Sequence, residues 1–455
     1  MNFTIPLNEL KDSVKGLAMV ISYRSSIPAL KAVRIAGDAA GVTITGTNLS
    51  EFLSYRLKDA EGTGSFIIDF KELRELVKGN RRSGNVTFQI QADLVKAVNA
   101  TGKEPVDHVF ARLPDKDFPE APAFDSEPDK ITKEALQSIT QALPLASRDN
   151  SRRTLKGILL EPDAIVASDG KQLVRFKGCT GVKQNMILPN TKVSSTGLLA
   201  SKDGVISQNK SHCQIVSGQW TYVVKAIAGT YPQYQHVIPK ESECSLALGD
   251  HNVQYLKSAL QQFETTSDHN AILLYVSGTD VRFLAESLKE PHIRIDGQYN
   301  GPEDTVLKLN RDQVIKALQL GFNKLSFSPG GVNPVLATGR GDDVFVFMSL
   351  YGGVKPEEVI KAVHNDSKAI KEENMSKEDQ KNPAEAGMPN RDDPGPFEEL
   401  FDGIKQLKLQ ARNTISYAND LQKKAKAAQK QAKLQEREFK STRDILEKLK
   451  NVSGF

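Results

Sequence analysis

The chain has 455 residues, more than one hydrophobic core usually supports, so about three domains are expected. Its 39% hydrophobic residues, 25% charged residues and formal net charge of +4 are an ordinary soluble composition. No apolar run approaches the roughly 20 residues that a bilayer-spanning helix needs, which excludes a membrane protein and predicts a cytoplasmic location.

The first third of the chain predicts two helix-and-strand units. Apolar residues spaced by three and four, such as Leu10, Val14 and Leu17, indicate a helix with one buried stripe. Residues 42–57 alternate around a polar turn, which is typical of a hairpin in a half-buried antiparallel sheet. The expected order is helix 6–21, hairpin 42–57, strand and helix 66–79 with Asp69 as N-cap, and strand pair 86–100.

The same order recurs twice at a period of about 115 residues, which is the mark of a repeat architecture. In the second third it is helix 131–143, hairpin 164–177, strand and helix 186–201 capped by Asn190, and strands 204–227. In the last third it is helix 251–263, hairpin 273–286, strand and helix 306–321 capped by Asn310, and strands 324–348. We therefore expect an α+β fold of three similar domains, 1–122, 128–242 and 243–353, each containing two βαβ units.

The C-terminal part of the chain departs from the repeat. Residues 354–396 are polar and charged with little aromatic content, which predicts a flexible linker. Within residues 397–455, a seam spaced by three and four runs from Ile404 to Leu449 and predicts a coiled-coil helical extension. Because alanine dominates the middle of the seam, hairpin packing within the chain, a basic solvated helix and pairing between molecules all stay open.

Six similar units predict a ring if strands of neighbouring units pair edge to edge and the helices face inward. Basic residues on those helices would then suit phosphate contacts without base readout, although each alone is also an ordinary solvating residue. These residues are Lys11, Lys15, Lys71, Arg74, Lys78, Lys133, Lys192, Lys202, Lys257, Arg311 and Lys316, with Arg81 and Arg82 just after one of the helices.

Two stretches of the second third, "SRRTLKGILLEPDAIVASDGKQL" (151–173) and "TYPQYQHVIP" (230–239), carry a family resemblance. The openings "MNFTIPLNEL" and "RSSIPALKAVRI" of the first third add to it. Together with the hairpin repeat, they resemble the β sliding clamp, the β subunit of bacterial DNA polymerase III. The resemblance covers residues 1 to about 352.

The resemblance implies a DNA-clamp fold, in which antiparallel sheets surround inward-facing helices in a ring of two head-to-tail subunits. It implies a processivity factor with no catalytic residue, cofactor or metal. The implied partners are double-stranded DNA bound without sequence preference, the replicative DNA polymerase, a clamp loader and a second copy of the chain. Basic residues that match the family's DNA-contacting positions are Arg24, Arg152 and, more loosely, Arg153.

The resemblance also implies an apolar pocket between the second and third domains, where partners dock a short peptide with Gln and paired Leu/Phe anchors. Lys171 and Gln172 replace the family's His-Arg. At the family's carboxyl terminus this chain reads "MSLYG" (348–352) and then continues for about a hundred residues. We hypothesise that the extension regulates access to the pocket or recruits another partner. The implied lining is Leu155, Ser168, Gly170, Lys171, Gln172, Leu173, Pro232, His236, Val237, Pro334, Val346, Phe347, Met348 and Leu350, with Val335 nearby; taken singly, each is explained equally well by core packing.

An enzyme and an open scaffold are the two alternatives to a closed ring. An enzyme is disfavoured because the Gly-rich segments 328–334 and 339–343 lack the phosphate-loop pattern, and Asp169 stands in an Asp-Gly turn. The three cysteines have no ligand-like spacing and predict neither disulfides nor zinc. The alternative is a clamp-fold scaffold without ring closure that recruits DNA-processing partners through its coiled coil.

Overall fold

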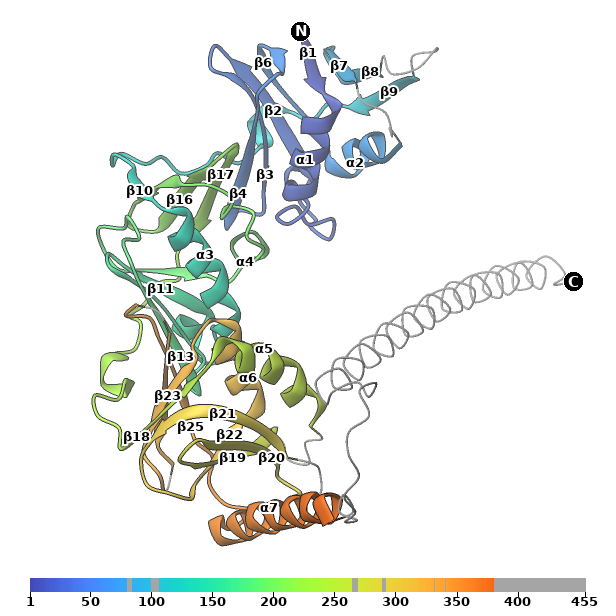
Figure 1. The fold of residues 1–455 in the computed structure, drawn as a ribbon. Helices are drawn as coiled ribbons and strands as arrows, with labels where there is room; N and C mark the ends of the chain where they lie inside the picture. The colour runs from blue at the N-terminus through green and yellow to red at the C-terminus, as the bar shows by residue number, and fades with distance from the viewer. Residues whose placement is uncertain are drawn as a thin grey trace, which may run out of the picture. The chain divides into compact units, whose positions relative to one another are not determined.

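The computed structural model describes residues 1–79, 84–99, 106–263, 269–288, 292–330, 332–339 and 341–379. Their strands form antiparallel sheets of five, eight and twelve strands, and short helices accompany them (Figure 1). The predicted α+β class with antiparallel sheets is therefore confirmed. Arg81, Arg82, the coiled coil 397–455 and the predicted linker beyond residue 379 lie outside the described residues.

Each third of the chain runs strand, helix and three strands, and then repeats that order once. The first third comprises β1 (Asn2–Pro6), α1 (Leu7–Leu17), β2 (Ala32–Asp38), β3 (Gly41–Thr47), β4 (Glu51–Leu57), the short β5 (Glu61–Gly62), β6 (Gly64–Asp69), α2 (Phe70–Gly79), β7 (Asn85–Ile90), β8 (Leu94–Asn99) and β9 (Val106–Ala111). The second comprises β10 (Asp129–Ile131), α3 (Lys133–Ala142), β11 (Gly157–Glu161), β12 (Ala164–Ser168), β13 (Gln172–Lys177), β14 (Met186–Pro189), α4 (Lys192–Ser195), β15 (Gly204–Gln208), β16 (His212–Ser217) and β17 (Trp220–Lys225). The last comprises β18 (Cys244–Leu248), α5 (Asp250–Ala259), β19 (Ala271–Ser277), β20 (Asp280–Ala285), β21 (Ile293–Asn300), β22 (Thr305–Asn310), α6 (Arg311–Gln319), β23 (Lys324–Phe327), β24 (Pro334–Thr338) and β25 (Val344–Met348).

The strand that precedes each helix pairs with the other half of its own third. In the first third β1 pairs with β7 and β6 pairs with β2. The same exchange joins β10 to β15 and β14 to β11, and then β18 to β23 and β22 to β19. The two helices of each third pack against each other, as α1 with α2, α3 with α4, and α5 with α6. Because of this exchange, neither half of a third is complete without the other.

Sheets also continue from one third to the next. Strand β17 pairs with β4, so that Tyr222 lies opposite Leu53, and the Trp220 ring packs edge-on against Tyr55 with centroids 4.5 Å apart. Strand β13 pairs with β25, so that Leu173 lies opposite Val346. Edge-to-edge pairing of neighbouring units is thus present at both junctions inside the chain.

Two of the three predicted N-caps are confirmed. Asp69 Oδ1 accepts the backbone N–H of Lys71 at 2.7 Å, and Asn310 Oδ1 accepts that of Asp312 at 2.9 Å. The prediction for Asn190 is wrong by one residue. Helix α4 is capped by Thr191, whereas the Asn190 side chain donates to the Leu143 carbonyl at 2.9 Å, because the chain turns into the helix one position later.

The outer faces of the three hairpins differ. In β3 and β4 the outward positions are polar except for Phe52, and the Thr45 and Ser54 hydroxyls hydrogen-bond at 2.8 Å. In the last third the outward Leu273, Tyr275 and Leu284 are buried instead. An apolar outer face needs a cover, because exposed aliphatic surface is unfavourable in water.

Helix α7 (Pro356–Asp379) provides that cover (Figure 1). Its Val359 and Val363, one helical turn apart, are fully buried against the outer face of β19 and β20. The prediction of a flexible linker over 354–396 is therefore wrong for residues 356–379. Two valines spaced i and i+4 among charged residues were too weak a pattern to predict a helix. The helix is stabilised instead by the packing of α7 on its sheet.

Candidate peptide-binding site

A tight turn between β12 and β13 shapes one side of the candidate site. Asp169 Oδ1 accepts the backbone N–H groups of Lys171 and Gln172 at 2.8 and 2.9 Å, and the Ser168 hydroxyl donates to the Gln172 carbonyl. Gly170 has φ +86°, a conformation that favours glycine. Asp169 is thus occupied as a turn former, which fits its Asp-Gly setting in the sequence.

A hollow of about 210 Å³ opens where this turn meets the junction of β13 and β25. Its walls belong to a small apolar cluster that includes Leu155, Leu173 and Val346. Aliphatic walls with a few polar groups at the rim suit the buried anchors of a peptide. The residues lining the hollow are Leu155, Ser168, Gly170, Lys171, Gln172, Leu173, Tyr231, Pro232, Gln233, Tyr234, Val237, Val346, Phe347 and Met348.

Most residues expected in the pocket meet in this hollow, but three do not line it. His236 is exposed on a short turn beside it. Pro334 lies one strand away on β24, paired with Met348, and the Leu350 N–H bonds to the Lys308 carbonyl of β22. Leu350 therefore belongs to the path that leads the chain away from the hollow towards α7.

Tyr231, Gln233 and Tyr234 line the hollow although sequence reasoning did not select them. The Tyr234 hydroxyl donates to Glu161 Oε2 at 2.6 Å, and burial, reinforced by this bond, raises the pKa of the phenol. Both tyrosine rings are buried in the cluster of Leu155 and Val346. Their position in the quoted motif, next to Pro232 and a few residues before Val237, was the signal available for them.

The basic residues expected to meet DNA fall into two groups. Lys71, Arg74 and Lys78 lie on α2, where Arg74 donates to the Tyr23 hydroxyl at 3.0 Å and Lys78 pairs with Glu75. Arg24, Arg153, Lys192 and Lys202 have exposed side chains.

Arg152 stands apart from the helices. Its Nη1 donates to the Asp169 carbonyl at 3.2 Å, and a Cβ added at Gly170 would meet the same nitrogen. The guanidinium is therefore seated against the turn that shapes the hollow, on the side of the candidate site. Its expected DNA contact stays a prediction.

Within the described ranges, no three His, Cys, Asp or Glu side chains are grouped so as to hold a metal ion. No helix in the same part of the chain is long and apolar enough to cross a bilayer.

The sequence of this chain is similar to those of known proteins. A family model described as DNA polymerase III beta subunit, N-terminal domain, matches residues 1–122. The beta sliding clamp of Pseudomonas putida is 24% identical over 342 residues, covering 71% of this chain and 88% of its own length. That of Chlamydia muridarum is 25% identical over 362 residues, covering 72% and 94%.

Solved structures agree in fold. The DNA polymerase III subunit beta of Pseudomonas aeruginosa superposes with a TM-score of 0.66 at 19% identity, covering 77% of this chain and 100% of that one. The DNA polymerase sliding clamp of Bacillus subtilis superposes with a TM-score of 0.68 at 18% identity, covering 77% and 99%. At these identities the likeness establishes the architecture alone.

Proposed function

The chain belongs to the DNA polymerase III β subunit family, and from this premise we propose that it is a sliding clamp. Two copies encircle duplex DNA head to tail and tether the replicative polymerase as a processivity factor. The clamp has no catalytic role of its own. Its partners are the polymerase, a clamp loader, and DNA bound without sequence preference.

The observation that carries this proposal is the strand junction that occurs twice inside the chain. Strand β17 ends the second third and pairs with β4, the last strand in the first half of the first third. Strand β25 ends the last third and pairs with β13, the last strand in the first half of the second third. Strand β9 ends the first third in the same way, and among the described residues it pairs with β8 alone. In the last third, β21 holds the position that β4 and β13 hold in the other two thirds. The first part of β21, residues 293–296, pairs with β20 on one side.

Two open edges of matching type lie at opposite ends of one series of units. An unpaired edge is a template for another strand, and Val109 of β9 is 64% exposed there. If β9 of one copy pairs with β21 of another, the junction is repeated a third time. A head-to-tail contact either closes or extends into a filament, and two copies with three units each close it with two identical junctions.

The paired helices supply the surface for DNA. Lys71 and Lys78 are exposed on α2, and Lys192 is exposed on α4. Contacts from such residues go to phosphates, which gives attraction without sequence preference and allows the protein to slide. The topological link, rather than tight binding, then keeps the ring on the DNA.

The apolar hollow supplies the docking site for the polymerase and the loader. It lies at the junction of β13 and β25, so both the second and the last third contribute to it. Deep apolar pockets at such junctions accept a few large side chains, which carry most of the binding energy of a peptide.

The proposal is tested on nicked circular DNA incubated with the protein, a clamp loader and ATP. A linked ring stays on the circle through a high-salt wash and leaves once a restriction enzyme linearises the DNA. A scaffold that grips DNA by charge alone behaves in the opposite way, since salt releases it and linearisation does not. That second result would replace the clamp with the scaffold alternative.

A further inference from the structure

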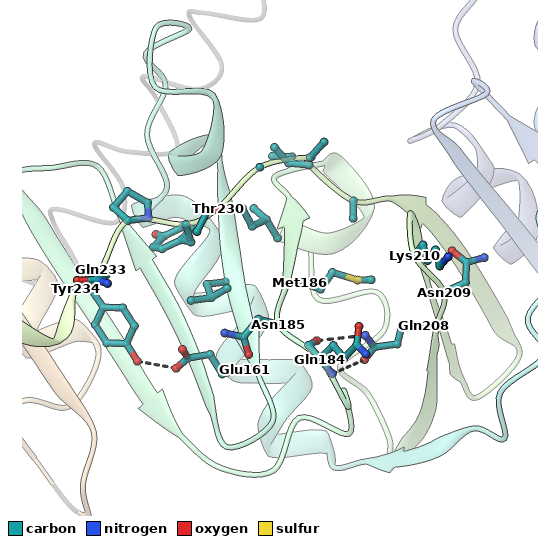
Figure 2. Close-up of a pocket in the computed structure, with 18 of the residues that line it drawn as sticks. Glu161, Gln184, Asn185, Met186, Gln208, Asn209, Lys210, Thr230, Gln233 and Tyr234 are labelled. Atoms are coloured by element: carbon teal, nitrogen blue, oxygen red, sulfur yellow. Dashed lines mark hydrogen bonds between the residues drawn. The ribbon is translucent and has the colours of Figure 1, made fainter.

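A second, larger hollow of about 590 Å³ opens beside the peptide-binding hollow on the second third of the chain (Figure 2). The two hollows share residues 231–234 as a common wall. Leu159 of β11 and Met186 and Ile187 of β14 line its apolar part. The loop that follows β17, residues 226–230, closes its other side.

A third hollow of about 200 Å³ adjoins the second at its far end. They share Gln184, Gln208, Asn209 and Lys210. Figure 2 shows Gln233 and Tyr234 at one end of the large hollow and Gln208, Asn209 and Lys210 at the other. The three hollows therefore follow one another, beginning at the peptide anchor site, to which the last third also contributes, and continuing along the second third.

The side chains around the large hollow fall into two kinds. Gln208 is satisfied internally, because its Oε1 accepts the Lys183 N–H at 2.7 Å and its Nε2 donates to the Gln184 carbonyl at 3.2 Å. The side-chain amides of Gln184, Asn185 and Gln233, in contrast, form no hydrogen bond within the described part of the chain. Each free amide offers both donors and acceptors to a ligand.

The charges and polar groups around the large hollow limit the chemical class of ligand that fits it. Glu161, the acid at the hollow, is engaged by Tyr234, and Lys210 lies at the far rim, so neither sign of charge dominates. Side-chain amides match the N–H and C=O groups of a peptide backbone, and an apolar floor with a methionine accommodates varied aliphatic side chains. An extended, mostly uncharged peptide segment fits this chemistry.

We propose that the large hollow and its neighbour bind the polypeptide segment that flanks the anchor residues of a docked partner. This inference rests on the proposed function, because it takes the apolar hollow as the anchor site. The occupant is the same partner polypeptide, which passes over residues 231–234 from the anchor hollow into the large hollow. Affinity then depends on the flank as well as on the anchors, and partners with equal anchors are ranked by their flanks.

The test uses three fluorescent probes on the full-length protein. The short probe is a peptide with one Gln and paired Leu and Phe anchors. Two long probes add an uncharged Ser/Ala/Leu flank of about eight residues, roughly 25 Å when extended, at one end or the other. One of the long probes is expected to bind about tenfold more tightly than the short one, which is the effect of a few satisfied hydrogen bonds and some apolar burial.

The variant Asn185→Trp fills the large hollow without touching the anchor site. It is expected to remove the gain of the long probe and to leave the short probe unchanged. Gln137→Trp, the same kind of change on an exposed position of α3, is the matched control and keeps the gain. Equal melting temperatures of both variants and the wild type show that the fold is intact.

The outcomes separate the two proposals. If neither long probe gains affinity, or if the gain survives Asn185→Trp, the flank does not use these hollows and the inference is wrong while anchor docking stands. If even the short probe fails to bind the wild-type protein, the docking part of the proposed function falls and the inference falls with it.

Discussion

Arg282 of β20 and Asp366 of α7 form an ion pair, with Nη1 and Oδ2 2.8 Å apart. The arginine is only 1% exposed, and it also pairs with Asp280 at 2.9 Å and donates to the Ser367 hydroxyl at 2.6 Å. A buried guanidinium without partners would be very unfavourable. The helix therefore completes the fold of the last third, and its first turns belong to the same compact unit as residues 1–355.

The first prediction concerns this ion pair. Asp366→Ala removes one partner of Arg282, and we expect it to lower the free energy of unfolding by about 1–2 kcal/mol. The figure is below that for a fully buried pair, because Asp366 is 43% exposed and Asp280 remains in place. Chemical denaturation followed by circular dichroism measures it. Glu358→Ala, an exposed acid on the same helix, is the control; equal stability of the two variants would contradict the role given to Asp366.

The second prediction concerns pH. His292 lies 3.6 Å from Asp366 and is largely buried, and burial lowers the pKa of its imidazole, although Asp366 opposes this. A base whose pKa is lower in the folded state binds protons more readily when unfolded. Its contribution to stability is complete above the unfolded pKa of about 6.5 and is lost as the pH falls through and below that value, with a slope of at most about 1.4 kcal/mol per pH unit.

Comparing wild type with His292→Asn between pH 8 and 5 isolates this contribution. The difference in unfolding free energy between the two proteins should change in favour of the variant below about pH 6.5. Two stability curves that stay parallel over the whole range would show that His292 does not titrate in this way.

Local patterns predicted much of the fold, since hairpin, helix and cap signals depend on neighbouring residues. The exchange of β1 and β6 between halves was missed, because the sequence of a strand does not specify a distant partner. Helix α7 had a usable signal. The hairpin at 273–286 is apolar on both faces, unlike 42–57, and an apolar outer face requires something to cover it.

The candidate site was predicted largely from family resemblance rather than from pattern. Leu155 and Val346 lie far apart in sequence and meet only because β13 pairs with β25. No local sequence pattern in either segment predicts that pairing. Tyr231 and Tyr234 were missed because buried aromatic residues in a linker resemble ordinary core residues.

The third prediction tests ring closure. Val109→Asp places a charge on the open edge of β9, where a second copy would pair, and should convert the dimer to a monomer with an unchanged circular dichroism spectrum. Light scattering measures the mass. The control is Val332→Asp, which changes another exposed valine, 52% exposed, away from that edge. A dimer that persists in Val109→Asp, or a wild-type protein that is monomeric, argues against the proposed junction.

The fourth prediction tests the anchor site. Val237 lines the apolar hollow and is 39% exposed, so Val237→Asp can be introduced without burying a charge in the core. A carboxylate at the wall must lose water when a peptide anchor enters, and we expect the affinity for the short anchor peptide to fall by at least about tenfold.

Fluorescence anisotropy with the labelled short peptide measures this loss, and Val332→Asp again provides the matched change, with wild-type affinity expected. The dimer should be unaffected in Val237→Asp, since the hollow and the β9 edge belong to different surfaces. Loss of peptide binding with the dimer intact, together with the reverse result for Val109→Asp, would show that partner docking and ring closure are carried by separate parts of the chain. Unaltered peptide affinity in Val237→Asp would instead place the anchor site elsewhere.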